Sequence, residues 1–310
     1  MSFNIDVKLY LSKLIVEPET KESELYGFLQ GGLSFVFRGR GMILLKFETE
    51  SASVARRYYS LCKEVFSVTP QIRQILKTQF GKTRIYSAEI SDYSACIEIL
   101  RYYNIADIQQ GFTLNWSIDR NLIASPQLQY AYLRGVFLSC GYLSDPYKNY
   151  LVEFRSQNSE YAHALLDFLN SFDLKATLRE KKNESVVYIK RAEDVSNVLA
   201  MCGAYETVLM LQDKIAQKEM KNRLQRVVNC DTANLNKTIE VSLIQQKAIE
   251  KIIRTKGLSV LPEYLIEAAQ LRMDYPESSL SELSALFDPP ISRSTLDKRL
   301  KKLIQIADQL

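Results

Sequence analysis

The feature that most constrains this chain is an internal duplication in its first two thirds, carried by the order of predicted elements with little residue identity. Each copy opens with a short apolar helical segment, Leu25-Tyr-Gly-Phe-Leu-Gln-Gly-Gly and Leu133-Arg-Gly-Val-Phe-Leu-Ser-Cys-Gly. Hydrophobic periodicity then predicts an α+β domain in which the order α-β-β-α-β-β-α occurs twice. Strands are predicted at residues 42–49, 71–77, 84–90, 150–155, 175–180 and 186–190, and later helices at residues 53–65, 93–103, 160–172 and 193–203.

Two glycines inside the opening helices require an explanation. A glycine in a helix costs about 1 kcal/mol relative to alanine, so Gly27 and Gly135 need a structural reason. Close approach of the two helices supplies one, because the absent side chain lets two backbones come together. Plain packing of each helix in a core, without such a seam, is the alternative.

The duplicated order of elements, with its two glycine-containing helices, resembles the LAGLIDADG homing endonucleases over roughly residues 20–204. The resemblance implies that the two helices pack side by side at the centre of the domain. It also implies that each helix ends in an acid that binds a divalent metal for phosphodiester cleavage, and that two curved sheets form a saddle over DNA.

The acids of that family are missing here. The penultimate position of the motif holds Gly32 in the first copy and Cys140 in the second. Neither offers the carboxylate oxygens that magnesium prefers, and two-metal hydrolysis needs such ligands to hold the ions and orient water. The nearby acids Glu24 and Asp145 are predicted on a different face or past the helix end. The sequence therefore predicts a nuclease-like fold with no catalytic residues, no metal ligands and no cofactor.

Composition argues against further classes of function. The only histidine, His163, lies within an amphipathic helix, and no glycine-rich nucleotide-binding loop occurs. Five scattered cysteines lack a C-x-x-C pair, which argues against a disulfide framework and a zinc ribbon. No apolar run approaches the roughly 20 residues of a membrane span, and the N-terminus has no export-type stretch. We therefore expect a cytoplasmic protein with no membrane partner.

Residues 205–257 are predicted to form a helical linker of two long helices, at about residues 206–228 and 232–255. In this prediction Asp231 caps the start of the second helix, and Gly257 ends it. The stretch between the helices is rich in amides and hydroxyls, which favour caps and turns over helix interiors.

Three residues near the predicted start of that second helix are candidates for DNA contact. They are Asn234, Asn236 and Lys237. Amides and a lysine near a helix N-terminus suit a phosphate or a base edge. Capping and a solvated helix face explain the same residues without DNA.

The last segment is predicted to form a helix, a short helix, a tight turn and a basic helix. Pro262 stands at the start of the first helix, where proline is tolerated. Ser279 and Glu282 match a capping box for the short helix, and Asp288-Pro-Pro-Ile ends it. Ser292 is predicted to cap the final helix. Its apolar stripe comprises Leu296, Leu300, Leu303 and Ala307.

This arrangement is typical of helix-turn-helix proteins, which insert the N-terminal part of the last helix into the major groove. Residues 292–302 contain five basic residues and one acid, so this segment alone carries the formal net charge of +4 that the whole chain has. Arg293 is predicted to contact a guanine edge, and the lysines are predicted to contact phosphates. The residues predicted to face DNA are Ser292, Arg293, Ser294, Asp297, Lys298, Lys301 and Lys302. A three-helix bundle that binds a protein partner is the alternative.

The chain resembles the WhiA family of bacterial regulators over its full length, from the opening Met-Ser-Phe onward, and most closely at about residues 205–310. The motifs that carry this resemblance are Asn229-Cys-Asp-Thr-Ala-Asn-Leu-Asn-Lys-Thr, Gly257-Leu, Leu261-Pro-Glu, Leu271-Arg-Met-Asp-Tyr-Pro-Glu-Ser-Ser-Leu-Ser-Glu-Leu and Pro289-Pro-Ile-Ser-Arg-Ser. The resemblance implies a degenerate homing-endonuclease domain at residues 1–204, a helical linker at residues 205–257 and a helix-turn-helix domain at residues 258–310, similar to region 4 of sigma factors.

The same resemblance implies a role in cell division, chromosome segregation or, in sporulating relatives, sporulation. We expect a non-enzymatic transcriptional regulator that binds double-stranded DNA at the nucleoid, with RNA polymerase or another regulator as a further partner. Two other hypotheses stay open. One is an active site-specific endonuclease, and the other is a chromosome-associated division protein that is not a transcription factor.

Overall fold

The computed structural model describes residues 3–38, 42–77, 83–107, 112–182 and 184–310. The chain divides into two compact units, Met1–Gln217 and Lys218–Leu310, which we name the N-terminal unit and the C-terminal unit. The first combines helices and sheets and the second is all-helical, so the predicted fold class is confirmed. Within the described ranges no helix is both long and apolar enough to cross a membrane.

The N-terminal unit contains the predicted duplication, and the order of elements is confirmed in both copies. The inner helix of each copy begins at a capped residue, because Ser51 accepts the Val54 N–H and Asn158 accepts the Tyr161 N–H. The first copy comprises α2 (Pro18–Gly32), β1 (Leu33–Arg38), β2 (Met42–Thr49), α3 (Ala52–Phe66), β3 (Gln71–Lys77), β4 (Thr83–Ile90) and α4 (Tyr93–Tyr102). The second comprises α5 (Pro126–Cys140), β7 (Gly141–Leu143), β8 (Val152–Ser156), α6 (Ser159–Asn170), β9 (Thr177–Lys181), β10 (Glu184–Ile189) and α7 (Ala192–Cys202).

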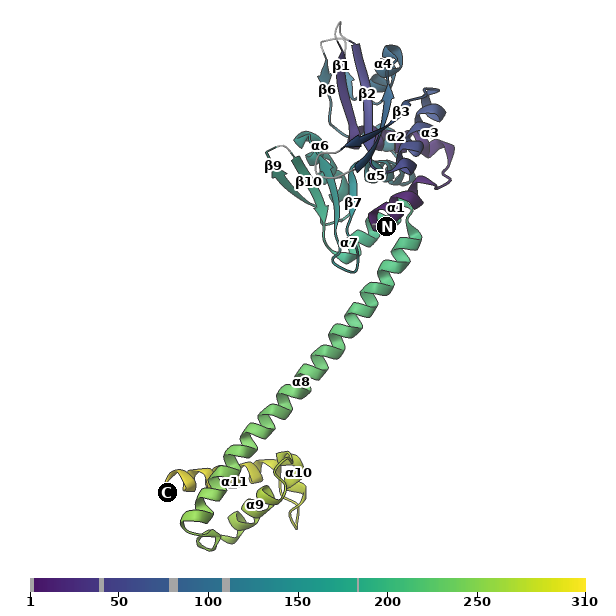
Figure 1. Ribbon diagram of the computed structural model, residues 1–310. Coiled ribbons are helices and arrows are strands. Elements are labelled where there is room, and N and C mark those ends of the chain that lie inside the picture. Colours follow the sequence, from purple (N-terminus) through teal and green to yellow (C-terminus); the bar gives the residue numbers. More distant parts are fainter. Residues whose placement is uncertain (1–2, 39–41, 78–82, 108–111, 183) are drawn as a thin grey trace. The chain divides into compact units, whose positions relative to one another are not determined.

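Each copy builds one antiparallel four-stranded sheet, and the strand order is the same in both. The strands labelled β1, β2 and β3 in Figure 1 belong to the first sheet, and those labelled β7, β9 and β10 belong to the second. The orders are β1-β2-β4-β3 and β7-β8-β10-β9. The register is also equivalent in part, because Leu45 pairs with Ile90 in the first sheet and Val152 pairs with Ile189 in the second. All four side chains are buried. Alternate residues of a strand point to one face, so these pairs turn the apolar face of each sheet toward the core.

Helices α2 and α5 pack against each other at the centre of this unit, and their glycines form the seam. A Cβ atom at Gly27 would overlap the carbonyl oxygen of Tyr132, and a Cβ atom at Gly135 would overlap the carbonyl oxygen of Glu24. Each glycine therefore lies directly against the backbone of the opposite helix. The close-approach explanation is confirmed, and the alternative of two helices without a seam is wrong.

Several short elements of this unit were not predicted. They are α1 (Phe3–Ser12), β5 (Ala106–Asp107), β6 (Thr113–Leu114) and the 3₁₀ helix η1 (Arg120–Ile123). Strands β1 and β7 belong to the predicted order, but no residues were assigned to them. Helix α1 buries Val7 and Leu11 in the core. Its two buried apolar residues are too few to give a helical period that pattern reading can detect.

The predicted break after residue 228 is wrong, because one continuous helix, α8 (Tyr205–Thr255), occupies this region. No glycine or proline lies in it, and asparagine, aspartate and threonine each cost a helix only about 0.7 kcal/mol or less. The Thr232 hydroxyl donates to the Val228 carbonyl oxygen at 2.8 Å, one turn earlier. Asp231 therefore lies inside the helix and is not an N-cap.

The C-terminal unit packs the end of α8 against three further helices. These are α9 (Glu263–Asp274), α10 (Leu280–Ala285) and α11 (Arg293–Asp308), with a 3₁₀ turn, η2 (Leu258–Val260), after α8. Both predicted caps are confirmed: Ser279 and Glu282 form the capping box of α10, and Ser292 caps α11. Helix α10 ends at Ala285, before the predicted end at Phe287. The core includes Ile249, Ile252, Leu265, Leu283, Leu296 and Leu300.

Candidate nucleic-acid interface

The start of α11 is fixed by a hydroxyl network. The Ser292 Oγ accepts the Thr295 N–H at 3.1 Å and lies 2.8 Å from the hydroxyl oxygens of both Ser294 and Thr295. A capped first turn holds its remaining N–H groups in a defined direction. Ser292 and Ser294, both predicted to face DNA, are exposed and already serve this cap. Arg293, the first residue of α11, lies between them in the sequence and is also exposed.

Helix α11 separates its apolar and basic side chains on two faces. Leu296, Leu300, Leu303 and Ala307 are buried, as the periodicity predicts. Arg293, Lys298, Lys301 and Lys302 are exposed. Within the described part of the chain, Arg293, Lys298 and Lys302 form no ion pair. Three uncompensated positive charges therefore remain on the solvent side of the helix.

Lys301 differs from the other basic residues of this face. Its Nζ lies 2.7 Å from Oδ2 of Asp297, one turn earlier. An exposed pair of this kind is worth about 0–1 kcal/mol, so a phosphate can displace the carboxylate at little cost. Asp297 thus reduces the charge of the face in the free protein.

Arg299 contributes to the positive charge of the segment but not to its exposed face. Its guanidinium lies 5.5 Å from the ring centre of Tyr264 and 5.3 Å from that of Phe287. It also lies 3.7 Å from a carboxylate oxygen of Glu267. The Arg299 side chain is only 19% exposed, and cation–π contacts of such an arginine stabilise a fold by about 1 kcal/mol or more. Arg299 therefore joins α11 to α9.

The structure brings one residue predicted on α8 together with one predicted on α11. Lys237 and Arg293 line the same hollow, of about 290 Å³. Asn234 and Asn236 are exposed on α8 but are not among the residues that line it. The complete lining is Lys237, Thr238, Val241, Arg272, Ser279, Leu280, Ser281 and Arg293. Two segments far apart in the sequence thus form one basic surface.

Arg272, at this hollow, was not predicted from the sequence. Its side chain is almost fully buried, and burial lowers the pKa of its guanidinium. Its Nη1 donates to the Ser278 carbonyl oxygen at 2.8 Å. A signal was present, because Arg272 continues the stripe of Leu265, Ala268 and Ala269 on the buried face of α9. A charged residue in an apolar stripe indicates a buried charge.

The degenerate metal positions of the N-terminal unit lie at the ends of the two central helices. A Cβ atom at Gly32 would lie 2.8 Å from the Phe47 ring, so this position has no room for a longer side chain without a shift of that ring. Burial raises the pKa of the Cys140 thiol to about 11, which keeps it neutral near pH 7. The Lys8 ammonium donates to the Leu138 carbonyl oxygen at 3.1 Å, where it opposes a metal cation.

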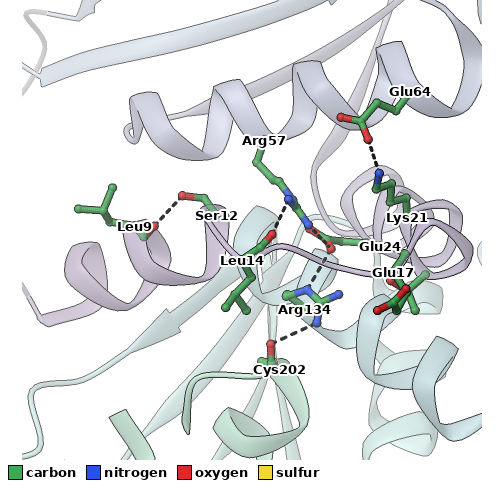
Figure 2. Close-up of polar contacts among 11 residues, drawn as sticks. Leu9, Ser12, Leu14, Glu17, Lys21, Glu24, Arg57, Glu64, Arg134 and Cys202 are labelled. Carbon is green, nitrogen blue, oxygen red and sulfur yellow. Dashed lines mark hydrogen bonds and ion pairs between the residues drawn. The ribbon is translucent and has the colours of Figure 1, made fainter. Parts of the chain in front are cut away.

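Glu24 is held by two arginines (Figure 2). Its carboxylate accepts Arg57 Nε at 2.7 Å, Arg57 Nη2 at 2.8 Å and Arg134 Nε at 3.0 Å. The glutamate is completely buried. Asp145 accepts the Tyr147 N–H in a surface turn. Across the described ranges, no cluster of three or more histidine, cysteine or acidic side chains could hold a metal ion.

Three family descriptions match this chain. The WhiA N-terminal LAGLIDADG-like domain matches residues 18–106, the WhiA LAGLIDADG-like domain residues 129–221, and the WhiA C-terminal HTH domain residues 224–307. The probable cell division protein WhiA of Thermoanaerobacter pseudethanolicus is 39% identical, over 100% of this chain and 98% of that protein. That of Clostridium perfringens is 34% identical over the same shares. The crystal structure of full-length WhiA from Thermotoga maritima has a TM-score of 0.60 at 24% identity, over 100% of this chain and 99% of that chain, and has the same fold.

Proposed function

The chain belongs to the WhiA family, and we propose that it is a sequence-specific DNA-binding regulator without nuclease activity. In this proposal α11 enters the major groove, Arg293 contacts a base edge, and Lys298, Lys301 and Lys302 contact phosphates. Residues 1–204 are the degenerate endonuclease domain, residues 205–257 a helical linker, and residues 258–310 the helix-turn-helix domain.

One observation carries the proposal. The exposed face of α11 has three basic side chains without an ion-pair partner in the described part of the chain, whereas its apolar face is buried. A helix that presents uncompensated positive charge next to a capped N-terminus suits the negatively charged walls of the major groove. Lys237 extends the same positive surface onto α8.

The absence of nuclease activity is part of the proposal. It is supported by Gly32 and Cys140 at the positions of the metal-binding acids, and by the ion pairs that engage Glu24. A plasmid-cleavage assay with magnesium or manganese tests it. Cleavage that disappears on mutating Asp145, or in a Glu24 variant shown to remain folded, would establish the endonuclease hypothesis instead.

The biological role is proposed from the relatives, which are named probable cell division protein. We infer that this chain acts at the nucleoid as a transcriptional regulator in cell division and chromosome segregation, with RNA polymerase or another regulator as a partner. Genome-wide occupancy measured together with transcript levels tests this role. Occupied sites whose genes keep their transcript levels when the protein is depleted would favour a chromosome-associated protein that does not regulate transcription.

The DNA-binding mode is tested with two variants on a specific and a random duplex over a salt series. Arg293→Ala is expected to flatten the preference for the specific duplex, because a base-edge contact discriminates by about 1–3 kcal/mol. Lys301→Ala combined with Lys302→Ala is expected to weaken both duplexes about equally. The salt slope is the fall in the logarithm of the binding constant per unit rise in the logarithm of the salt concentration. The double variant should lower it by about 0.9 for each phosphate that is no longer neutralised.

A matched control comes from the same unit. Arg254→Ala removes an exposed charge from the end of α8, roughly 25 Å along the helix from Lys237 at about 1.5 Å per residue. It is expected to leave both affinities unchanged. Wild-type affinity and slope in the α11 variants would contradict the proposed groove contact. A lower slope with unchanged discrimination in Arg293→Ala would assign that arginine to the DNA backbone.

A further inference from the structure

The C-terminal unit buries a guanidinium that lacks a counter-charge. Arg272 is 2% exposed, and within the described part of the chain it forms no ion pair. Within the described part of the chain its one hydrogen bond goes to the Ser278 carbonyl oxygen, and its buried Nε has no partner. A guanidinium carries five N–H donors, so the protein groups of the described residues satisfy only one of them.

This arrangement is costly in the free protein. An uncompensated buried charge destabilises a fold unless it is paired and hydrogen-bonded. Burial lowers the pKa of Arg272, but the ordinary pKa of arginine is so high that the group stays charged at neutral pH. The missing negative charge must therefore come from outside the chain if the cost is to be offset.

The hollow beside Arg272 is suited to an anion. Lys237 from α8 and Arg293 from α11 line it together with Arg272, and the hydroxyls of Thr238 and Ser281 add polar groups. No acid is among its lining residues. The nearby Glu282 carboxylate accepts the Ser279 N–H in the capping box of α10 and is engaged there. Three cations thus converge on one small cavity.

We propose that this hollow is a phosphate-binding site in which Arg272, Lys237 and Thr238 hold one phosphodiester of the DNA backbone. The inference rests on the proposed function, and it deepens it by adding a contact from α8 and α9 to those of α11. Arginine suits phosphate because its planar fork can donate two parallel hydrogen bonds. The phosphate would supply the counter-charge that Arg272 lacks, so DNA would fix α8 against the helix-turn-helix.

Two variants test the site in the full-length chain, with random-sequence duplex as the probe. Arg272→Met keeps the volume and removes the charge, and Lys237→Ala changes only the exposed rim. Each variant leaves one cation on the single phosphodiester, so each is expected to lower the salt slope by up to about 0.9 and to weaken specific and random duplexes about equally. Arg254→Ala is the control that should change neither.

Thermal stability separates a binding role of Arg272 from a structural one. If Arg272 serves to bind an anion, Arg272→Met without DNA should unfold at the wild-type temperature or above. Random duplex should then raise its melting temperature less than it raises that of the wild type. If Arg272 only fixes the turn at Ser278, the variant should unfold earlier and keep the wild-type salt slope. That second result would overturn the proposal, and so would a wild-type slope in a stable Lys237→Ala.

A second arm uses inorganic phosphate and distinguishes this site from the proposed function. Loss of DNA binding in the α11 variants, with wild-type binding in Arg272→Met and Lys237→Ala, would overturn the phosphate site alone. If the wild type bound no DNA, the proposed function would fail. In that case the melting temperature decides whether the hollow binds free phosphate. It does so if millimolar phosphate raises the melting temperature of the wild type more than chloride does at equal ionic strength, and if this gain is absent in Arg272→Met. Without that gain the site would be refuted as well.

Discussion

Replacing Glu24 by glutamine is expected to destabilise the N-terminal unit strongly. The carboxylate accepts three hydrogen bonds, at 2.7 Å and 2.8 Å from Arg57 and at 3.0 Å from Arg134. The arginine side chains are only 13% and 9% exposed, and that of the glutamate is fully buried. Glu24→Gln keeps the shape of the side chain but removes the carboxylate charge that both arginines contact. Two guanidinium groups then remain buried together.

The size of the effect follows from the burial of the partners. Removing one member of a buried ion pair costs about 3–5 kcal/mol, because the remaining charge is left without compensation. Here the two remaining charges also repel each other, so the upper part of that range is expected. Glu64→Gln is the matched control. Its pair with Lys21 is half exposed, and such surface pairs are worth about 0–1 kcal/mol.

Urea unfolding followed by a probe in the N-terminal unit measures the difference. The expected result is a loss of about 3–5 kcal/mol for Glu24→Gln and less than about 1 kcal/mol for Glu64→Gln. Replacing Glu24, Arg57 and Arg134 together by methionine should recover most of the loss, since a complete apolar replacement leaves no unpaired charge. A Glu24→Gln variant as stable as its control would refute the role of buried charge here, and so would a triple variant less stable than the single one.

Three further outcomes follow from the same structure. Gly27→Ala should destabilise the seam by about 3 kcal/mol or more in urea unfolding, because its Cβ would overlap the Tyr132 carbonyl oxygen; an unchanged midpoint would contradict the close approach. Exposed Cys230 should react with iodoacetamide at neutral pH far faster than Cys62, because Cys62 is buried and burial raises the pKa of its thiol to about 12. Mass spectrometry measures the two rates, and equal rates would refute this expectation. Millimolar magnesium should leave the melting temperature almost unchanged, whereas a site specific to the folded state would add a few kcal/mol at saturation.

The features that the sequence predicts well are local ones. The capping box at Ser279 and Glu282 and the N-cap at Ser292 depend on residues three apart, so they can be located without any tertiary contact. The glycines at Gly27 and Gly135 are informative for a related reason, because their cost in a helix requires a compensating contact. The duplicated order of helices and strands rests on periodicities of the same local kind.

One error is local, and the others arise where tertiary context decides. The break placed at Asp231 assumed that polar residues end a helix, but without a glycine or proline their small propensity cost does not interrupt α8. A count of charges cannot show that Arg299 stacks on Tyr264, while the preceding residue, Lys298, is exposed to solvent. Whether Arg272 is paired depends on residues from three helices, which no sequence window contains.

The two units differ in whether their buried charged side chains have a partner of opposite charge. This difference indicates where bound DNA adds stability. In the N-terminal unit, Glu24 is neutralised by arginines of the same chain. In the C-terminal unit, Arg272 lacks an ion pair within the described residues, and so do Arg293 and Lys298. A buried cation that already contacts a carboxylate gains less from an added anion than a buried cation without one, which gains both a Coulomb partner and the hydrogen bonds it lacks. The salt-dependent part of DNA affinity should therefore come mainly from the C-terminal unit, and Glu24→Gln should leave the salt slope unchanged at temperatures where the variant is folded.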